Sequence, residues 1–200
     1  MSEAGGVKRV CVFCGSSDDV APAYLETARE MGRAVARRGM TLVYGGGGTG
    51  MMGRLADGAL EGGGQVIGIL TEQFNTPALR HARLTERCVV PTMHQRKAMM
   101  AELSEAFLAL PGGFGTLEEL FEVLCWAQLG LHQRPIGLLN TGGYYDPLLA
   151  AIQRARDEGF IYQEHHDLFF TSASPEALLD RIGEFQPPTG LGRWLRLDTV

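Results

Sequence analysis

The chain has 200 residues, of which 45% are hydrophobic and 20% are charged, values typical of one globular domain with a sizeable core. Its formal net charge of −5 argues against a nucleic-acid-binding surface, which normally carries an excess of basic residues. No apolar run resembles a signal peptide or is long enough to span a membrane, so we expect no membrane association.

Short apolar runs alternate along the chain with longer amphipathic segments. The apolar runs predict strands at residues 8–14, 41–45, 65–70, 87–91, 106–110, 135–139 and, more weakly, 168–171. The amphipathic segments predict helices at residues 21–38, 50–62, 93–104, 116–129, 146–158 and 175–185. Because the strands are continuously apolar, we expect helices on both faces of the sheet. The pattern therefore predicts the α/β class, with a doubly wound, mostly parallel sheet of about seven strands.

No linker divides the chain, so we expect one domain over residues 1–200, with irregular tails at 1–6 and 187–200. Segment 72–86 lacks periodicity and is expected to be a loop near the site. In such sheets ligands bind beyond the carboxyl ends of the strands, which directs attention to the loops that follow them.

The loop 111–119, with sequence PGGFGTLEE, follows one strand and opens a helix. Its three glycines allow close approach to the backbone, and the helix N-terminus supplies unpaired N–H donors and a partial positive charge. This combination favours a phosphate site. The alternative is a tight turn with a capping box formed by Thr116 and Glu119, which leaves the glycines unexplained. A carboxylate at Glu119, near the helix N-terminus, is expected to stay ionised.

A second glycine-rich loop, residues 45–53, contains GxGxxG at 48–53. Glu72 follows at roughly the distance expected of a ribose-binding acid in a dinucleotide fold. This pattern keeps open an NAD-dependent oxidoreductase. The alternative is that these glycines serve only packing.

Two further loops carry polar residues. Thr92 is placed to cap a helix whose first turns hold Arg96 and Lys97, where cations oppose the helix dipole. An anionic ligand or a carboxylate partner would explain them, as would a solvated basic face. The sequence CGSS at 14–17 ends the first strand and either binds phosphate or ribose or caps the next helix.

The cysteines and histidines do not predict a metal site. Cys11 and Cys14 are an odd number of residues apart on a strand, so their side chains are expected on opposite faces. No second CxxC completes a zinc site. We expect four reduced thiols, as in a cytoplasmic protein, and no metal.

The sequences MHQRK at 93–97 and PGGFGTLEE at 111–119 resemble the LOG family, the cytokinin riboside 5′-monophosphate phosphoribohydrolases. CVFCGSS, LVYGGGGTGMMG, LCWAQLG and PIGLLNTGGYYDPLL extend the resemblance over about residues 8–185. It implies a Rossmann-like fold, a homodimer, no redox cofactor, and hydrolysis of an N6-modified adenosine 5′-monophosphate to free base and ribose 5-phosphate.

The resemblance implies that Arg96 and Glu119 are catalytic. Together, the loops and the resemblance give the expected nucleotide contacts: Gly15, Ser16, Gly46, Gly47, Met93, Lys97, Gly112, Gly113, Phe114, Gly115, Thr116, Leu117, Glu118 and Cys125. The chain departs from plant members at two positions near the ligand. Ala78 stands near the place of a glutamate, and Cys125 replaces a threonine.

Two more alternatives remain open at this point. Relatives of the family often carry the label lysine decarboxylase, but only Lys8 and Lys97 among the 18 basic residues are lysines that could hold pyridoxal phosphate. A non-catalytic nucleotide or cofactor carrier would use the same loops for binding alone.

Overall fold

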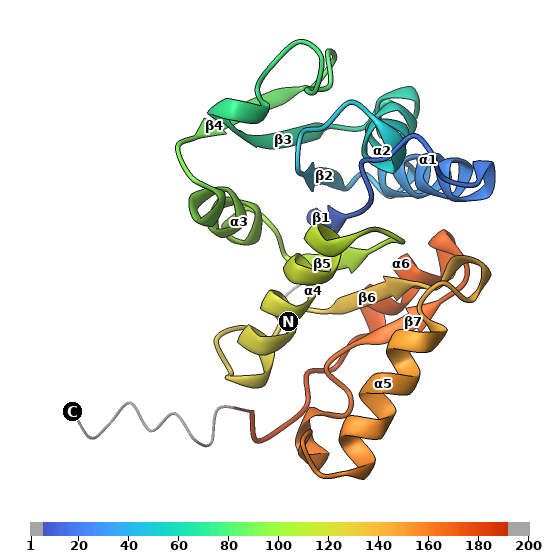
Figure 1. Cartoon of the computed structure of the whole chain (residues 1–200), viewed down its shortest axis with the longest axis vertical. Coiled ribbons are helices and arrows are strands. Elements are labelled where there is room, and N and C mark those ends of the chain that lie inside the picture. Colours follow the sequence, from blue (N-terminus) through green and yellow to red (C-terminus); the bar gives the residue numbers. More distant parts are fainter. Residues whose placement is uncertain (1–5, 192–200) are drawn as a thin grey trace.

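The computed structural model describes residues 6–191, which form one seven-stranded sheet with helices on both faces (Figure 1). The strands follow the order β4-β3-β2-β1-β5-β6-β7, and every neighbouring pair is parallel. Their bounds are β1 Arg9–Phe13, β2 Thr41–Tyr44, β3 Val66–Thr71, β4 Glu86–Val90, β5 Ala106–Ala109, β6 Ile136–Leu139 and β7 Phe170–Ser172.

The helices form two layers, each with its own apolar cluster against the sheet (Figure 1). One layer contains α1 (Pro22–Arg37), α2 (Gly50–Glu61) and α6 (Pro175–Glu184). The other contains α3 (Met93–Glu102), α4 (Phe114–Gln128) and α5 (Asp146–Asp157). Short 3₁₀ turns lie at Glu72–Phe74, Thr141–Gly143 and Gln163–His165. Within the described residues, no helix is both long and apolar enough to cross a membrane.

The doubly wound α/β prediction is confirmed, and the observed element bounds differ from the predicted ones by at most two residues. One difference matters for the site: α4 begins at Phe114, with Gly113 as its N-cap, and not at Thr116. The predicted tails lie partly outside the described residues, at 1–5 and 192–200. Residues 187–191, which are described, contain no helix or strand.

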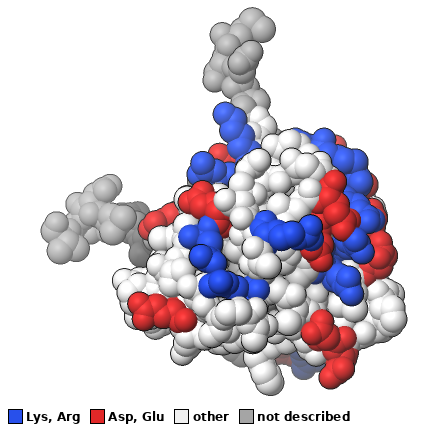
Figure 2. Space-filling view, turned by 90° about the horizontal axis from the view of Figure 1, so that it is seen from above, with Lys and Arg blue, Asp and Glu red and all other residues white. Residues whose placement is uncertain are grey.

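The two cysteines of the CxxC pattern point to opposite faces of the sheet, as predicted. Cys14 belongs to the apolar cluster beneath α1 and α2, and Cys11 to the cluster beneath α3 and α4. All four cysteines are free thiols. On the face that Figure 2 presents, basic and acidic side chains are interspersed, and no continuous basic surface is seen there.

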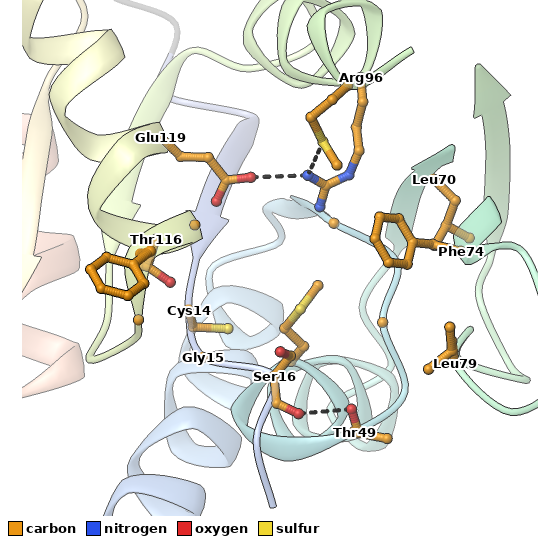
Figure 3. Close-up of a pocket in the computed structure, with 17 residues that line it drawn as sticks. Cys14, Gly15, Ser16, Thr49, Leu70, Phe74, Leu79, Arg96, Thr116 and Glu119 are labelled. Atoms are coloured by element: carbon orange, nitrogen blue, oxygen red, sulfur yellow. Dashed lines mark hydrogen bonds and ion pairs between the residues drawn. The ribbon is translucent and has the colours of Figure 1, made fainter. Parts of the chain in front are cut away.

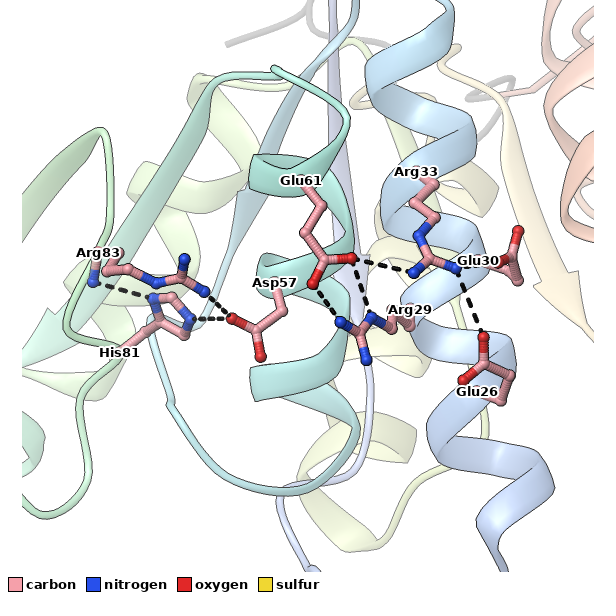
Figure 4. Close-up of polar contacts among 8 residues, drawn as sticks. All are labelled: Glu26, Arg29, Glu30, Arg33, Asp57, Glu61, His81 and Arg83. Atoms are coloured by element: carbon pink, nitrogen blue, oxygen red, sulfur yellow. Dashed lines mark hydrogen bonds and ion pairs between the residues drawn. The ribbon is translucent and has the colours of Figure 1, made fainter.

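Helices α1 and α2 approach each other closely because glycines face the partner helix. A Cβ on Gly58 would lie 2.0 Å from the carbonyl oxygen of Arg29, and one on Gly32 would lie 2.1 Å from that of Leu55. Ion pairs of Glu61 with Arg29 and Arg33 join the same two helices at the surface (Figure 4). Hydrogen bonds from Arg29, then Arg33, lower the pKa of Glu61 to about 2, so this carboxylate stays charged under ordinary conditions.

The close approach predicts opposite effects for one substitution at two helical glycines. Gly58→Ala is expected to destabilise the fold by about 1–3 kcal/mol, because the new methyl group overlaps backbone. Gly183→Ala in α6 has no atom within 4 Å of its added Cβ. It is expected to stabilise the fold by about 0.5–1 kcal/mol through helix propensity. Urea denaturation measures both, and equal stabilisation by the two variants would contradict the packing argument.

Candidate active site

The principal cavity lies where the winding of the sheet reverses. Strands β1 and β5 are neighbours, but the chain continues from β1 toward β4 and from β5 toward β7, so their carboxyl ends diverge into a crevice. A cavity of about 430 Å³ opens there. Its lining comes from the ends of several strands and the starts of α3 and α4: Cys14, Gly15, Ser16, Gly45, Gly47, Thr49, Met52, Leu70, Phe74, Leu79, Met93, Arg96, Gly113, Phe114, Gly115, Thr116 and Glu119.

The N-terminus of α4 forms one side of this cavity (Figure 3). Its first N–H groups have no partner within the helix and carry the positive end of the helix dipole. A Cβ on Gly113 or Gly115 would meet nothing within 4 Å, and neither residue has a positive φ. Protein packing therefore does not require glycine at these positions, and their backbone is left open to the cavity. Gly112 differs, since Thr116 fills the space beside it.

The capping box considered for Thr116 and Glu119 is not present. Thr116 lies inside α4, is buried, and makes no cap hydrogen bond, because the helix begins two residues earlier than predicted. Glu119 is therefore free of a capping role, and its side chain turns into the cavity instead (Figure 3). The Thr92 cap, in contrast, is confirmed: its hydroxyl accepts from the Gln95 N–H at 3.2 Å.

Two tyrosines after β6 support the loop before α4. The hydroxyl of Tyr144 donates to the carbonyl of Gly112, and that of Tyr145 to the carbonyl of Leu110, each at 2.6 Å. Burial raises the pKa of Tyr145, so its hydroxyl remains a donor. The sequence NTGGYYDP thus holds the loop in place from the neighbouring strand end.

The side chains of Arg96 and Glu119 meet at the top of the cavity (Figure 3). Nη1 of Arg96 lies 3.0 Å from Oε1 of Glu119, and both side chains are only 12% exposed. Nε of Arg96 donates to the carbonyl of Ile69 at 2.9 Å, which fixes the guanidinium to the end of β3. A Cβ on Gly45 would lie 1.9 Å from Nη2, so the glycine leaves the space that the guanidinium occupies.

Burial, and not the helix dipole, has the largest effect on the electrostatics of Glu119. Burial raises the pKa of its carboxyl, and the charge and hydrogen bond of Arg96 only partly oppose this effect. The helix start has little influence because Glu119 lies in the second turn of α4, beyond the unpaired N–H groups. The group is a carboxyl whose affinity for protons is increased by its surroundings.

Lys97 does not line the cavity. Its side chain is 9% exposed, and its Nζ contacts the carboxylates of Glu118 and Glu122. Burial alone would lower the pKa of Lys97, but these hydrogen bonds outweigh it and raise the pKa. Lys8, the other lysine, is exposed at the opposite, amino-terminal edge of β1. Neither lysine is therefore placed to hold an aldehyde cofactor in this cavity.

The second glycine loop is shaped by contacts within the protein. Cβ atoms on Gly48, Gly50 and Gly53 would each lie within 3 Å of neighbouring backbone, and Gly50 also has a positive φ. Glu72 is exposed in a 3₁₀ turn and does not line the cavity. The GxGxxG glycines are thus explained by packing, the alternative to a dinucleotide site.

An apolar wall faces the α4 terminus across the cavity and consists of Leu70, Phe74 and Leu79 (Figure 3). Phe74 and Leu79 belong to the predicted loop between β3 and β4. Backbone hydrogen bonds attach this loop to residues 46–48, including the Gly48 N–H to the Leu79 carbonyl at 2.8 Å. Buried His81 adds a side-chain contact to Asp57 at 3.3 Å (Figure 4).

The cavity collects most, but not all, of the residues predicted as contacts. Gly15, Ser16, Gly47, Met93, Arg96, Gly113, Phe114, Gly115, Thr116 and Glu119 line it. Gly46, Lys97, Gly112, Leu117, Glu118 and Cys125 do not. Cys125 lines a separate cavity of about 90 Å³ between α4 and α5, and Ala78 is exposed outside the principal one.

Several lining residues were not predicted: Cys14, Gly45, Thr49, Met52, Leu70, Phe74 and Leu79. Gly45 and Leu70 adjoin the carboxyl ends of β2 and β3, where the strand-end rule could have identified them. Phe74 and Leu79 belong to segment 72–86, which is predicted to lie near the site, but both are exposed, and single exposed apolar residues carry no signal of their own.

Comparison with known proteins gives consistent relatives. Residues 52–182 match the family model described as "Possible lysine decarboxylase". The chain is 45% identical to "Probable cytokinin riboside 5'-monophosphate phosphoribohydrolase LOGL2" of Oryza sativa subsp. japonica, over 90% of this chain and 74% of the relative. It is 44% identical to cytokinin riboside 5'-monophosphate phosphoribohydrolase LOG7 of Arabidopsis thaliana, over 90% and 83% of the two chains.

Solved structures share the fold at lower identity. The molybdenum cofactor carrier protein of Chlamydomonas reinhardtii superposes with a TM-score of 0.67 at 24% identity, over 88% of this chain and 96% of that one. The molybdenum cofactor binding protein of Rippkaea orientalis gives 0.69 at 23%, over 91% and 98%. These likenesses establish a common Rossmann-like fold. The family match and the identity to the plant proteins place the chain in the LOG family of cytokinin riboside 5′-monophosphate phosphoribohydrolases.

Proposed function

We propose that this protein hydrolyses the N-glycosidic bond of adenosine 5′-monophosphate or an N6-modified form of it, giving free base and ribose 5-phosphate. The observation that carries the proposal is a single cavity with the Glu119 carboxylate at its top and an α4 N-terminus with open glycines at its side. The phosphate of a nucleoside 5′-monophosphate would bind at the α4 N-terminus, and its glycosidic carbon would lie beside Glu119. The names of the 44–45% identical relatives support the same reaction.

The proposed chemistry follows from the charges of the site. Cleavage of the bond between C1′ and the base nitrogen leaves positive charge on the ribose and electrons on the departing base. The Glu119 carboxylate stabilises that charge and accepts a proton from the attacking water, whose oxygen bonds to C1′. The base takes up a proton from water as it leaves, and Glu119 afterwards returns its proton to water, so that one water is consumed overall. Arg96 holds Glu119 in place with one nitrogen of its guanidinium group, whose planar shape suits a carboxylate.

Phosphate binding at α4 supplies affinity remote from the reacting bond. Free N–H groups and the helix dipole favour the phosphate dianion at Gly113–Thr116. Binding energy of this kind is used to position the ribose against Glu119. The wall of Leu70, Phe74 and Leu79 then lies on the side left for the base and suits an apolar substituent on it.

The other functions find less support in the site. A pyridoxal-dependent decarboxylase needs a lysine in the cavity, and Lys97 points into an ion-pair cluster instead. An NAD-dependent enzyme would use Glu72, which does not line the cavity, and the glycines of GxGxxG, which are explained by packing. A carrier that only binds its ligand would not explain why a buried Arg96–Glu119 ion pair lines the cavity.

A homodimer and a cytoplasmic location belong to the same proposal. The free thiols fit a reducing compartment. Phe114 is 95% exposed at the cavity rim and Phe121 on α4 is 41% exposed, which fits a face covered by a second copy. Sedimentation of the protein measures its oligomeric state directly. The wild type is expected to be a dimer and a Phe114→Ser/Phe121→Ser variant a monomer, because the variant loses exposed apolar surface. A monomeric wild type would contradict the proposed dimer.

The central prediction concerns the Arg96–Glu119 pair. Glu119→Gln and Arg96→Met are each expected to lower kcat for base release by at least about 10²-fold, the scale of a lost acid–base group. Chromatography of base and ribose 5-phosphate from AMP and N6-isopentenyl-AMP measures the release, with circular dichroism as the check on folding. Binding without release by the wild type would favour the carrier, and full activity of Glu119→Gln would refute the mechanism.

The raised pKa of Glu119 predicts the acid side of the pH profile. The active form is the ionised carboxylate, so kcat/KM, which reports the free enzyme, falls as the pH drops through the pKa of Glu119. Because burial raises this pKa above its ordinary value of 4.5, the fall is expected above pH 4.5. Arg96→Met is expected to raise the Glu119 pKa further, as measured by NMR titration of labelled glutamate. A fall centred at or below pH 4.5 would contradict this assignment.

Gly45 provides a test of Arg96 that leaves both charged residues in place. The methyl group of Gly45→Ala displaces the end of the guanidinium, a flexible group, so the protein is expected to stay folded. A misplacement of about 1 Å is expected to lower kcat by about 10²-fold with little change in KM. Gly115→Ala is the matched control: its methyl enters the cavity beside the phosphate position and is expected to raise KM. Identical effects of the two variants would contradict the assignment.

A further inference from the structure

Lys97 lies next to Arg96 in sequence but points into a different environment. Arg96 faces the cavity, whereas the Lys97 ammonium is buried between α3 and α4. Its Nζ donates to Glu118 and, at 2.9 Å, to Glu122. A buried lysine that already contacts two carboxylates has little capacity left for a phosphate, and its positive charge is balanced within the protein.

The three glutamates of α4 divide between these two cations according to helix geometry. Glu118 and Glu122 are four residues apart and lie on one face of α4, where Lys97 contacts both. Glu119 is one residue further on and points to a different side, where it meets Arg96. Contact at two points along α4 fixes the rotation of the helix about its own axis. That rotation decides whether the Glu119 carboxylate faces the cavity.

We propose that Lys97 is a positioning residue, which locks α4 against α3 so that Glu119 meets Arg96, and that it does not contact the nucleotide. The proposal rests on the function proposed above and assigns Glu118 and Glu122 to the same locking cluster. Phosphate binding is then left to the α4 N-terminus, and the cluster acts on catalysis only through the placement and charge of Glu119.

The charges around Glu119 give this role a distinct signature. The titratable groups whose charges influence or respond to Glu119 are Arg96 and Lys97 from α3, Glu118 from α4, and the thiols of Cys11 in β1 and Cys14 directly after it. Lys97 lowers the pKa of Glu119 and Glu118 raises it. Loss of Lys97 therefore moves the Glu119 pKa up, and loss of Glu118 moves it down, although both changes break the same ion pair.

The first experiment compares Lys97→Met with Lys8→Met, the same substitution at the chain's other lysine, which is exposed and remote from the cavity. For Lys97→Met, kcat for AMP and N6-isopentenyl-AMP is expected to fall about tenfold or more while KM stays within about twofold, the pattern of an interaction that acts only in the transition state. Lys8→Met is expected to match the wild type. A phosphate contact would instead raise KM.

Calorimetry with ribose 5-phosphate tests binding without catalysis. Lys97→Met is expected to keep the wild-type affinity within about twofold, whereas loss of a charged phosphate contact would weaken it about tenfold or more. NMR titration of Glu119 in Lys97→Met and Glu118→Gln should show the opposite pKa changes. These measurements test the hydrolase function and the positioning role of Lys97 separately. A wild type that releases no base would refute the hydrolase function. The role of Lys97 would still be tested by the ribose 5-phosphate affinity and by the pKa of Glu119.

A triple variant keeps the test decisive if Lys97→Met alone unfolds, as removal of one member of a buried ion cluster can cause. Lys97→Met/Glu118→Gln/Glu122→Gln removes both the cation and its partners. It is expected to fold and to recover part of the lost kcat, because neither carboxylate of the cluster is left without its cation. A triple variant with weakened ribose 5-phosphate binding and raised KM would overturn the proposal, since only a direct contact would then explain Lys97.

Discussion

The arrangement of this molecule depends on one buried ion pair, between Arg96 and Glu119. The two residues come from the starts of different helices, and each helix follows a different strand of the sheet. A guanidinium and a carboxylate that are both 12% exposed stabilise each other only if their geometry is maintained, because an unpaired charge at this depth is costly. Much of the surrounding structure therefore serves to fix two side chains.

Three kinds of contact maintain that geometry. The carbonyl of Ile69 accepts from Nε of Arg96, and the missing side chain of Gly45 leaves room for its far end. Tyr144 and Tyr145 hold the loop from which α4 begins. The Lys97 cluster sets the rotation of α4 in our proposal. These supports come from β3, the residue after β2, the segment after β6, and α3, so segments that are far apart in the sequence contribute to the position of one carboxylate.

The two glycine-rich loops have different physical roles despite similar composition. In the loop at 45–53, added side chains would strike backbone or the side chains of Met52, Leu70 and Arg96, which shows a packing requirement. At the N-terminus of α4, Gly113 and Gly115 border open space, which fits a requirement for access in our proposal. This difference, more than the number of glycines, separates the phosphate site proposed here from a dinucleotide site. It also explains how a GxGxxG pattern occurs in a family of hydrolases.

The sequence by itself determined the elements, the doubly wound sheet and the strand ends around the cavity, because apolar periodicity and glycine position are local properties. Only the tertiary structure decided which side chains line the cavity and which pack or form ion pairs elsewhere. Arg96 lines the cavity, whereas the adjacent Lys97 belongs to an ion cluster outside it. Cys125 lines a different cavity. Thr116 lies inside α4 because the helix begins two residues earlier than predicted. Phe74 and Leu79 reach the cavity through long-range backbone bonds of their loop. Such outcomes depend on helix rotation and on burial by distant segments, which no local pattern encodes.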